Sequence, residues 1–301
     1  MGKASGFARA YRVTDGRKFR IGAVDPGNTG GLKSKEAARG WLEKGTALLA
    51  GLQEKLYADD RWSVLVVLQA MDAAGKDGTI KHVMSGVNPQ GVQVVSFKAP
   101  SAEELDHDFL WRSLKALPER GRIGIFNRSY YEEVLVVRVH EELLAAEKLP
   151  ERLVTKRVWR ERFESINDVE RHLVRNGTVV LKFFLHVSKA EQGRRLLSRL
   201  EDREKHWKFS PNDLAEREHW GQYMAGYEEM IRATATPQAP WHVIPADNKW
   251  FARLAVASAI VDALEGLDLA YPEPGPEMRT RIAAARAALT AGRRRPTDAK
   301  R

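Results

Sequence analysis

The sequence predicts an α/β fold in which helices cover both faces of a mostly parallel sheet. Five short apolar runs are bounded by turn residues, a pattern typical of strands buried on both faces of such a sheet. Segments with helical periodicity separate the runs, and this alternation is typical of doubly wound proteins. The runs cover residues 63–68, 92–97, 123–126, 179–187 and 241–244.

Helix boundaries are marked by capping residues. Ser-x-x-Glu patterns at residues 101–104 and 188–191 predict capping boxes directly after strands. The Ser-Pro pair at residues 210–211 predicts a further helix start, with proline at the first helical position. Long amphipathic helices are expected over residues 34–57 and 150–177.

One large domain is expected to take up most of the chain. It covers residues 1–270, with an N-terminal extension over about 1–33 and a lid over about 194–215. The proline-rich stretch YPEPGPEM then interrupts the pattern. Residues 271–301 are expected to contain this break, an Ala/Arg-rich helical stretch and a basic tail.

The composition excludes several classes of protein. With 301 residues, 43% hydrophobic and 30% charged, the chain is large enough for a substantial core and is not disordered. It has no cysteine, which excludes disulfides, thiolate metal sites and a cysteine nucleophile. No stretch approaches the roughly 18 to 20 apolar residues of a membrane helix, and no apolar core of a secretory signal follows the start. We therefore expect a cytoplasmic protein that does not enter a membrane.

The net charge of +9 is concentrated at the two ends of the chain. Residues 1–40 hold nine basic and three acidic side chains, and residues 276–301 hold eight basic and two acidic ones. Residues 41–275 therefore carry a net charge of −3. A basic protein favours a polyanionic partner, but a polyanion site within this acidic body must be a local cluster of basic residues.

The strongest functional motif follows the first predicted strand. The sequence from Asp72 to Thr79, DAAGKDGT, leads into a helical segment, which is the context of a phosphate-binding P-loop. Backbone N–H groups and the positive end of the helix hold phosphate oxygens in such a loop, and the lysine, here Lys76, reaches the terminal phosphates. The other phosphate-binding candidates of the loop are Ala73, Ala74, Gly75, Asp77, Gly78 and Thr79.

The match to the usual P-loop pattern is imperfect. That pattern has glycine at the position of Ala70, and Ser or Thr directly after the lysine, where this chain has Asp77. Thr79 comes two residues later. Without the hydroxyl in its usual place a metal ion needs another ligand, and Asp72 is the candidate. A glycine-rich turn that binds no ligand is the alternative.

A second polar segment, NRSYYEE, follows the third predicted strand. It should lie beside the P-loop, because ligands of open α/β sheets bind at the carboxyl ends of the strands. Asn127 stands where such a strand often has an aspartate, and Arg128 is expected to bind a phosphate. Glu132 or Glu133 is expected to supply a carboxylate near the metal or the attacking group. A solvated charge run at a strand end is the alternative.

Residues 194–208 contain six basic and three acidic side chains. A mobile arginine-rich element over a P-loop suits phosphoryl transfer, because such catalysts mainly position groups and neutralise charge. A solvated helix face is the alternative. The candidate phosphate ligands in this segment are Arg194, Arg195, Arg199 and Lys208.

Four segments, in order, resemble the family 2 polyphosphate kinases: MDAAGKDGTIKHV, FNRSYYEEVLVVRVH, RLEDREKHWKFSPND and ATATPQAPWHVIPADNKWFARL. The resemblance runs from about residue 25 to residue 264. It implies a P-loop kinase-like, three-layer α/β/α sandwich with a parallel sheet and a helical lid. The implied activity is Mg²⁺- or Mn²⁺-dependent phosphoryl transfer between inorganic polyphosphate and a nucleotide, forming a nucleoside triphosphate. The resemblance also implies a homo-oligomer, either a dimer or a tetramer.

By position, Asp72 resembles the family's metal-binding aspartate, Lys76 its phosphate-gripping lysine and Arg128 the arginine after the third strand. Many members have aspartate at the position of Asn127 and asparagine at that of Glu132. The form FNRSYYEEVLVV is similar to a subgroup that accepts both nucleoside monophosphates and diphosphates. AMP and ADP are the expected acceptors, and GMP and GDP are further candidates.

Two alternative functions stay open at this point. An ATP-dependent nucleotide kinase would share the P-loop but not the segments downstream. A non-catalytic polyanion-binding or nucleic-acid-binding protein would use the basic ends of the chain. Under the kinase interpretation no specific nucleic acid is expected.

Overall fold

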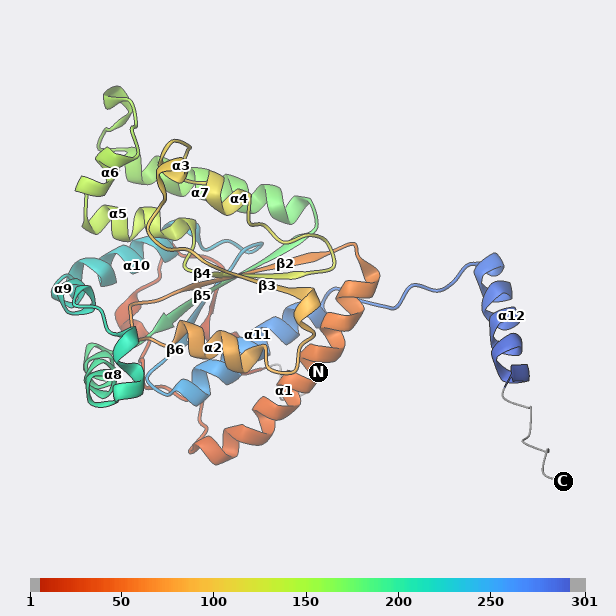
Figure 1. Cartoon of the computed structure of the whole chain (residues 1–301). Coiled ribbons are helices and arrows are strands. Elements are labelled where there is room, and N and C mark those ends of the chain that lie inside the picture. Colours follow the sequence, from red (N-terminus) through yellow and green to blue (C-terminus); the bar gives the residue numbers. More distant parts are fainter. Residues whose placement is uncertain (1–5, 293–301) are drawn as a thin grey trace.

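A six-stranded sheet forms the centre of the computed structural model, which describes residues 6–292. The strand order is β1-β6-β5-β2-β4-β3, in which β1 is antiparallel to β6 and all other pairs are parallel. Helices cover both faces and complete the three-layer α/β/α sandwich (Figure 1). The strands are β1 (Arg12–Val13), β2 (Ser63–Gln69), β3 (Val92–Ser96), β4 (Ile123–Asn127), β5 (Thr178–His186) and β6 (Trp241–Pro245).

All five strands predicted from apolar runs are confirmed, each within one residue at either end. β1 escaped prediction because its two residues are too few to show a periodic pattern. The expected burial on both faces is wrong for β3, which lies at the edge of the sheet, where Val94 is 49% exposed. Side chains of an edge strand point to the two faces of the sheet at its margin, and in β3 they are incompletely covered.

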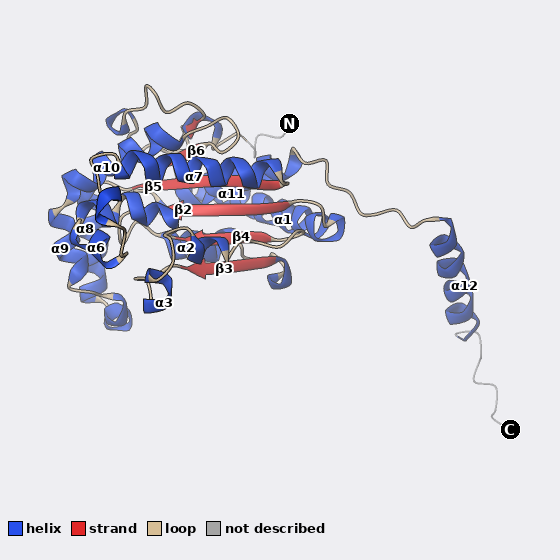
Figure 2. Cartoon of the chain, turned by 90° about the horizontal axis from the view of Figure 1, so that it is seen from above, coloured by secondary structure: helices blue, strands red, loops and turns tan. Residues whose placement is uncertain are grey.

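The helices form two layers (Figures 1 and 2). One face of the sheet is covered by α7 (Val158–Arg175) and α10 (Trp220–Thr234). The opposite face is covered by α2 (Lys76–Val83) and α11 (Lys249–Glu265), and α11 packs in turn against α1 (Lys35–Asp59). α11 is apolar almost all round because it lies between the sheet and α1.

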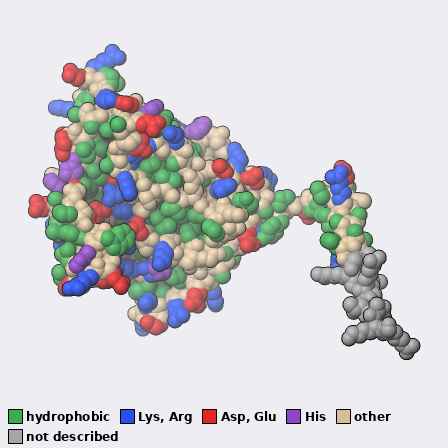
Figure 3. Space-filling model, in the orientation of Figure 1, with side chains coloured by type: hydrophobic (Ala, Val, Ile, Leu, Met, Phe, Trp, Pro, Cys, Tyr) green, Lys and Arg blue, Asp and Glu red, His purple; other side chains and the backbone are tan. Residues whose placement is uncertain are grey.

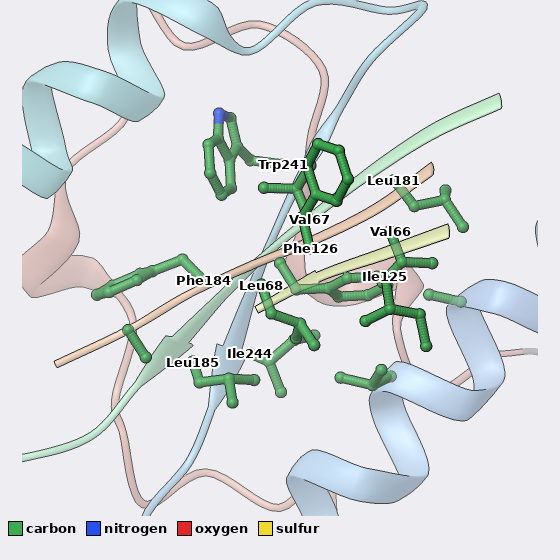
Figure 4. Packing of buried hydrophobic residues seen from close by; sticks show 14 of the residues in the cluster. Val66, Val67, Leu68, Ile125, Phe126, Leu181, Phe184, Leu185, Trp241 and Ile244 are labelled. Carbon is green, nitrogen blue, oxygen red and sulfur yellow. The ribbon is translucent and has the colours of Figure 1, made fainter. Parts of the chain in front are cut away.

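Apolar side chains of the central strands form the core. Residues 64–68 of β2 are at most 1% exposed, and Trp241 of β6 is fully buried. Figure 4 shows side chains of β2, β4, β5 and β6 packed on both faces of the sheet. Burial of each large aliphatic or aromatic side chain contributes about 1.5–3 kcal/mol, so this cluster supplies most of the driving force for folding.

Shorter elements connect these layers. The other α-helices of the body are α3 (Ala102–Leu105), α4 (Trp111–Leu114), α5 (Val136–Val139), α6 (Glu142–Ala146), α8 (Lys189–Glu201) and α9 (Asn212–Glu218). The 3₁₀ helices are η2 (Arg9–Tyr11), η3 (Ile21–Ala23), η4 (Pro89–Gly91), η5 (Tyr130–Val134), η6 (Glu151–Leu153) and η7 (Arg203–Lys208).

The predicted helix starts are mostly confirmed. Ser34 caps α1, and the capping box at residues 101–104 makes both of its hydrogen bonds. At residues 188–191 only Ser188 makes its bond, because the Glu191 carboxylate pairs with arginines of α8 instead. The start predicted at residues 210–211 is displaced slightly, since α9 begins at Asn212.

The single long helix expected over residues 150–177 is partly wrong. Its first turns form the separate 3₁₀ helix η6, and the regular helix α7 begins at Val158. Residues 154 and 155, valine and threonine, are β-branched and disfavour a continuous helix at this point.

The helical stretch expected after YPEPGPEM is confirmed as α12 (Pro276–Gly292). It stands apart from the body at the end of an extended connection (Figures 1 and 3). The basic tail predicted after this helix lies outside the described residues. Within residues 6–292, no helix combines the length and the apolarity needed to cross a membrane.

Candidate active site

A pocket of about 810 Å³ opens at the carboxyl ends of the strands. β2 lies at the point where the strand order reverses, because the chain continues to β3 and β4 on one side and to β5 and β6 on the other. Such a reversal leaves a crevice in which ligands of open α/β sheets bind. α8 and α9 lie beyond this end of the sheet (Figure 2), and Lys and Arg side chains gather over α8 and α2 (Figure 3).

The predicted P-loop lines this pocket between β2 and α2. Gly75 has a φ of 110°, a conformation that glycine adopts without a steric penalty. Ala73 also has a positive φ, of 60°, which is a strained value for a residue with a side chain. The backbone N–H groups of the first turn of α2 have no acceptors within the helix, so they are available to phosphate oxygens.

Lys76, the first residue of α2, is 9% exposed. Its Nζ donates a hydrogen bond of 2.7 Å to the carbonyl oxygen of Ala70, where the loop begins. Burial and the nearby charge of Arg128 lower the pKa of Lys76, whereas the charges of Asp72, Glu132 and Asp77 raise it, and the net direction is down. The ammonium group is thus largely desolvated, which strengthens its attraction for a phosphate.

A chain of hydrogen bonds joins the P-loop to the segment after β4. Arg128 donates through Nη2 to Asp72 Oδ1 at 2.6 Å and through Nη1 to Glu132 Oε2 at 2.9 Å. Gln69 Nε2 donates to Glu132 Oε1 at 2.8 Å, so both oxygens of this carboxylate are occupied. The structure therefore brings Asp72, Arg128 and Glu132 together, and Glu132 orients the arginine.

Glu133 lies elsewhere. It is 7% exposed, does not line the pocket and accepts a hydrogen bond of 2.8 Å from Arg162. Glu147 pairs with the same arginine. Successive residues of a 3₁₀ helix point about 120° apart, and Glu132 and Glu133 consequently face different surroundings. Of the two metal-ligand candidates in this segment, neither lines the pocket: Glu132 is joined to it through Arg128, and both of its oxygens are already engaged.

The basic residues of the predicted lid divide into two kinds. Arg194, Arg195, Arg199 and Lys208 all line the pocket, and Arg199 donates to Asp213 Oδ2 at 3.1 Å. Arg195 is only 7% exposed, and its guanidinium is occupied by backbone carbonyls and one carboxylate. Its acceptors are Glu191, Ala73, Ala74, Ala246 and Asp247. Arg195 lines the pocket, as the sequence predicted, but its donors are engaged by carbonyl groups of the P-loop and of the turn after β6, so it also supports the loop. Its contact with phosphate stays a prediction.

Several pocket residues escaped the sequence analysis. Lys98 follows β3, and Lys249 and Arg253 stand four residues apart at the start of α11, after β6. Burial, followed by the charge of Arg195, lowers the pKa of both Lys249 and Arg253. Applying the strand-end rule to every predicted strand would have found these three residues. The others missed as site residues include Asp213, Lys205 and Trp207, all on the α8–α9 side.

The pocket is strongly basic although the body of the chain is not. It is lined by ten basic and four acidic side chains. This is the local cluster that a polyanion site in an acidic body requires. The basic residues are Lys76, Lys98, Arg128, Arg194, Arg195, Arg199, Lys205, Lys208, Lys249 and Arg253, and the acidic ones are Asp72, Asp77, Glu191 and Asp213.

The acidic side chains decide whether the pocket suits a magnesium ion. Within residues 6–292 no group of three or more His, Asp or Glu is placed to hold a metal by itself. Mg²⁺ does not need such a group, because it commonly takes one or two carboxylates together with substrate phosphates and water. Asp72 uses only Oδ1 in its bond to Arg128 and lines the pocket. The residues therefore fit a magnesium ion shared with phosphates.

Comparison with known proteins agrees with this geometry. Residues 32–271 match the family model of polyphosphate kinase 2. The chain is 50% identical over 279 residues to the ADP-polyphosphate phosphotransferase of Rhodopseudomonas palustris, covering 91% of this chain and 95% of the relative. It is 46% identical over 267 residues to the AMP/ADP-polyphosphate phosphotransferase of Meiothermus ruber, covering 88% and 96%.

A solved structure is similar over nearly the whole chain. The crystal structure of polyphosphate kinase 2 from Arthrobacter aurescens superposes with a TM-score of 0.87 at 42% identity. The superposition covers 97% of this chain and 99% of that one.

Proposed function

Because the chain belongs to the polyphosphate kinase 2 family, it is a phosphotransferase, and we propose that it transfers a phosphoryl group between inorganic polyphosphate and nucleoside mono- and diphosphates. One observation carries the proposal: a P-loop lysine and basic side chains from α8 and α11 line a single pocket of about 810 Å³. The relatives named for ADP and for AMP/ADP support both kinds of acceptor.

The phosphate chain is held by charge. Its terminal phosphate lies against Lys76 and the free N–H groups of the first turn of α2. The rest of the chain follows the basic side chains that line the pocket, such as Lys98 and Arg253. We propose that residues 194–215 act as a lid, with Arg194, Arg199 and Lys208 closing over the polyanion.

Transfer proceeds by in-line displacement. A terminal phosphate oxygen of the nucleotide attacks the terminal phosphorus of polyphosphate, and the bond from that phosphorus to the bridging oxygen breaks. The shortened chain keeps the bridging oxygen and its electron pair. Both the attacking and the leaving group are anionic phosphates, so the reaction needs no protein nucleophile and no strong base. Lys76, Arg128 and Arg199 neutralise the charge that spreads over the moving phosphoryl group.

Mg²⁺ is the proposed cofactor, with Mn²⁺ as a substitute, and Asp72 is the residue proposed to hold it. When bound, the ion neutralises phosphate oxygens and helps to align them. Burial alone raises the pKa of Asp72, but the charges of Lys76, Arg128 and Arg199 outweigh burial and bring the pKa below its ordinary value. Asp72 therefore stays anionic at neutral pH and suits a divalent cation.

The proposal is tested by following ATP formation from ADP and from AMP with polyphosphate as the only donor. Lys76→Ala and Asp72→Asn are each expected to lower the rate at least about 100-fold, which corresponds to roughly 3 kcal/mol of barrier. Lys81→Ala, on the same helix but outside the pocket lining, is the matched control. Near-normal turnover by either site variant would contradict the site assignment.

The same assay separates the two alternative functions. An ATP-dependent nucleotide kinase would convert AMP and ATP to ADP without polyphosphate. A nucleic-acid-binding protein would show no phosphoryl transfer, and its binding would weaken steeply with salt.

A further inference from the structure

Asp77 and Asn127 meet at the mouth of the P-loop. Asp77 directly follows Lys76 in the first turn of α2, and Asn127 is the last residue of β4. Asn127 Nδ2 donates a hydrogen bond of 2.7 Å to Asp77 Oδ1, and Ser96 Oγ lies 3.4 Å from the same nitrogen. Both residues line the pocket.

Relative to the common P-loop arrangement, the carboxylate stands at the position after the lysine and not at the end of the strand. In P-loop enzymes the residue after the lysine supplies a hydroxyl to Mg²⁺, and an aspartate follows a neighbouring strand. Here the residue after the lysine is a carboxylate, and the residue at the strand end is a neutral amide. The pair keeps one negative charge, but that charge lies on the loop instead of on the strand.

The orientation of the amide follows from its partner. A carboxylate only accepts hydrogen bonds, so a flipped amide would bring two oxygens together. In the present orientation Asn127 Oδ1 is buried and has no hydrogen-bond partner among residues 6–292. The Oδ1 atom of Asn127 thus accepts no hydrogen bond among these residues, while its Nδ2 atom holds the Asp77 carboxylate. Within the same residues, Oδ2 of the exposed Asp77 makes no hydrogen bond.

A simpler role for Asp77 is stabilisation of the helix start. An acidic residue in the first turn interacts favourably with the helix dipole, usually by 0.3–1 kcal/mol. That role requires no partner on another strand and predicts no effect on metal binding. The two roles therefore give different results in a metal titration.

We propose that Asp77 supplies to the metal–phosphate complex the carboxylate that a strand-end aspartate supplies in the common arrangement, and that Asn127 positions it. This inference deepens the proposed function and rests on it. Asp72 holds the first carboxylate position and Asp77 the second, and both line the pocket beside Lys76.

The test is a double-mutant cycle with a binding readout. The variants are Asp77→Asn, Asn127→Asp and the exchanged pair that carries both changes. Mn²⁺ is titrated into each protein saturated with the methylene analogue of ADP, which cannot transfer its phosphate. Electron paramagnetic resonance of free Mn²⁺ then gives the dissociation constant. Glu36→Gln, an equivalent neutralisation in the first turn of α1 outside the pocket lining, is the matched control.

Asp77→Asn alone is expected to weaken Mn²⁺ binding at least about tenfold, as loss of a group that supports a metal does. In the Asn127→Asp background the same change is expected to alter the dissociation constant less than about threefold, because the charge then stands on the strand. Equal losses in both backgrounds, or no loss in either, would overturn the inference. Thermal melts of all variants show whether the fold is retained.

Failure of this inference is distinguishable from failure of the proposed function. ATP formation from polyphosphate by the unmodified protein is measured on the same preparation. If the unmodified protein is active and the two substitutions act independently, only the role of Asp77 is wrong. If the unmodified protein does not use polyphosphate at all, the proposed function fails.

Discussion

The guanidinium of Arg195 donates a hydrogen bond of 2.6 Å to the carbonyl oxygen of Ala74 in the P-loop. The same side chain reaches the carbonyl oxygens of Ala246 and Asp247, which follow β6. Only arginine carries the planar fork of donors that can serve so many acceptors at once. Arg195 consequently ties α8, the P-loop and the turn before α11 into one unit.

Replacement of Arg195 is therefore expected to affect stability as well as activity. Arg195→Ala leaves buried carbonyl groups without donors and is expected to lower the free energy of unfolding by about 3 kcal/mol or more. Arg199→Ala, which breaks a partly exposed ion pair with Asp213, is expected to lower it by less than about 1 kcal/mol. Urea denaturation measures both values. Equal effects would show that Arg195 does not support the loop.

Arg253 belongs to the basic pocket residues that the sequence analysis missed, together with Lys98 and Lys249, and its replacement tests their role. Arg253→Ala is expected to raise the KM for polyphosphate about tenfold, because the change removes a pocket cation that is expected to form a charged hydrogen bond with a phosphate. The melting temperature should change little, since the side chain is only partly buried. Arg39→Ala, an exposed arginine on α1 outside the pocket lining, is the control. An unchanged KM in the Arg253 variant would show that polyphosphate does not contact Arg253.

The pair of carboxylates around Arg162 predicts a dependence of stability on pH. Burial, and then the charge of Glu147, raises the pKa of Glu133 from an ordinary value of 4.5 to about 8. A carboxyl group with a raised pKa binds its proton more tightly in the folded chain. Its contribution to stability is therefore complete below the ordinary pKa and is lost as the pH rises through 8.

Glu133→Gln removes this titration and keeps the shape of the side chain. The variant is expected to melt close to the unmodified protein at pH 5 and above it at pH 8.5. Thermal melts at both pH values measure the difference. A variant that loses stability relative to the unmodified protein as the pH rises would contradict the direction of this pKa shift.

A buried ion pair joins Lys182 of β5 to Glu170 of α7. Lys182 is fully buried on β5, and its Nζ donates to Glu170 Oε2 at 2.6 Å and to the carbonyl oxygen of Thr234 at 2.7 Å. Tyr130 and Tyr131 donate to the other oxygen of Glu170. Since both tyrosines follow Arg128 closely in the chain, this cluster anchors the segment that carries the site arginine.

Lys182→Met leaves the Glu170 charge buried without its cation, which is expected to cost about 3–5 kcal/mol of folding free energy. The double change Lys182→Met with Glu170→Leu is expected to recover most of that loss, because no charge is then left unpaired. Denaturant unfolding of the three proteins measures the coupling. If the double variant were less stable than Lys182→Met alone, the loss would come from packing and not from an unpaired charge.

The sequence predicted the fold well where the evidence is local. The apolar run of β2 and the glycine and lysine of the P-loop are neighbours in the chain, so their pattern indicates a strand, a turn and a helix without knowledge of anything else. Ser34 and Ser101 likewise mark helix starts through bonds to residues three positions away. β1 could not be found in this way, because its two residues show no pattern and its partner, β6, lies more than 200 residues later.

The sequence predicted many of the residues of the site, but not which side chains contact one another. Strand-end reasoning correctly brought Asp72 and Arg128 to one pocket, since parallel strands place their carboxyl ends at the same edge. It did not separate Glu132 from Glu133, because adjacent residues of η5 differ only in the direction in which their side chains leave the helix.

By itself, then, the sequence determined the layer order of strands and helices, the P-loop and the need for a local basic cluster in an acidic body. Only the folded chain shows which basic side chains of the pocket have their donors occupied by backbone carbonyls. Arg195 and Arg199 lie one helical turn apart and both line the pocket, yet the Arg195 guanidinium is buried against backbone carbonyls, whereas Arg199 pairs with Asp213 of α9. A charged side chain takes its role from the groups packed around it, and for Arg195 those groups come from the P-loop and from the turn after β6, both far from α8 in the chain.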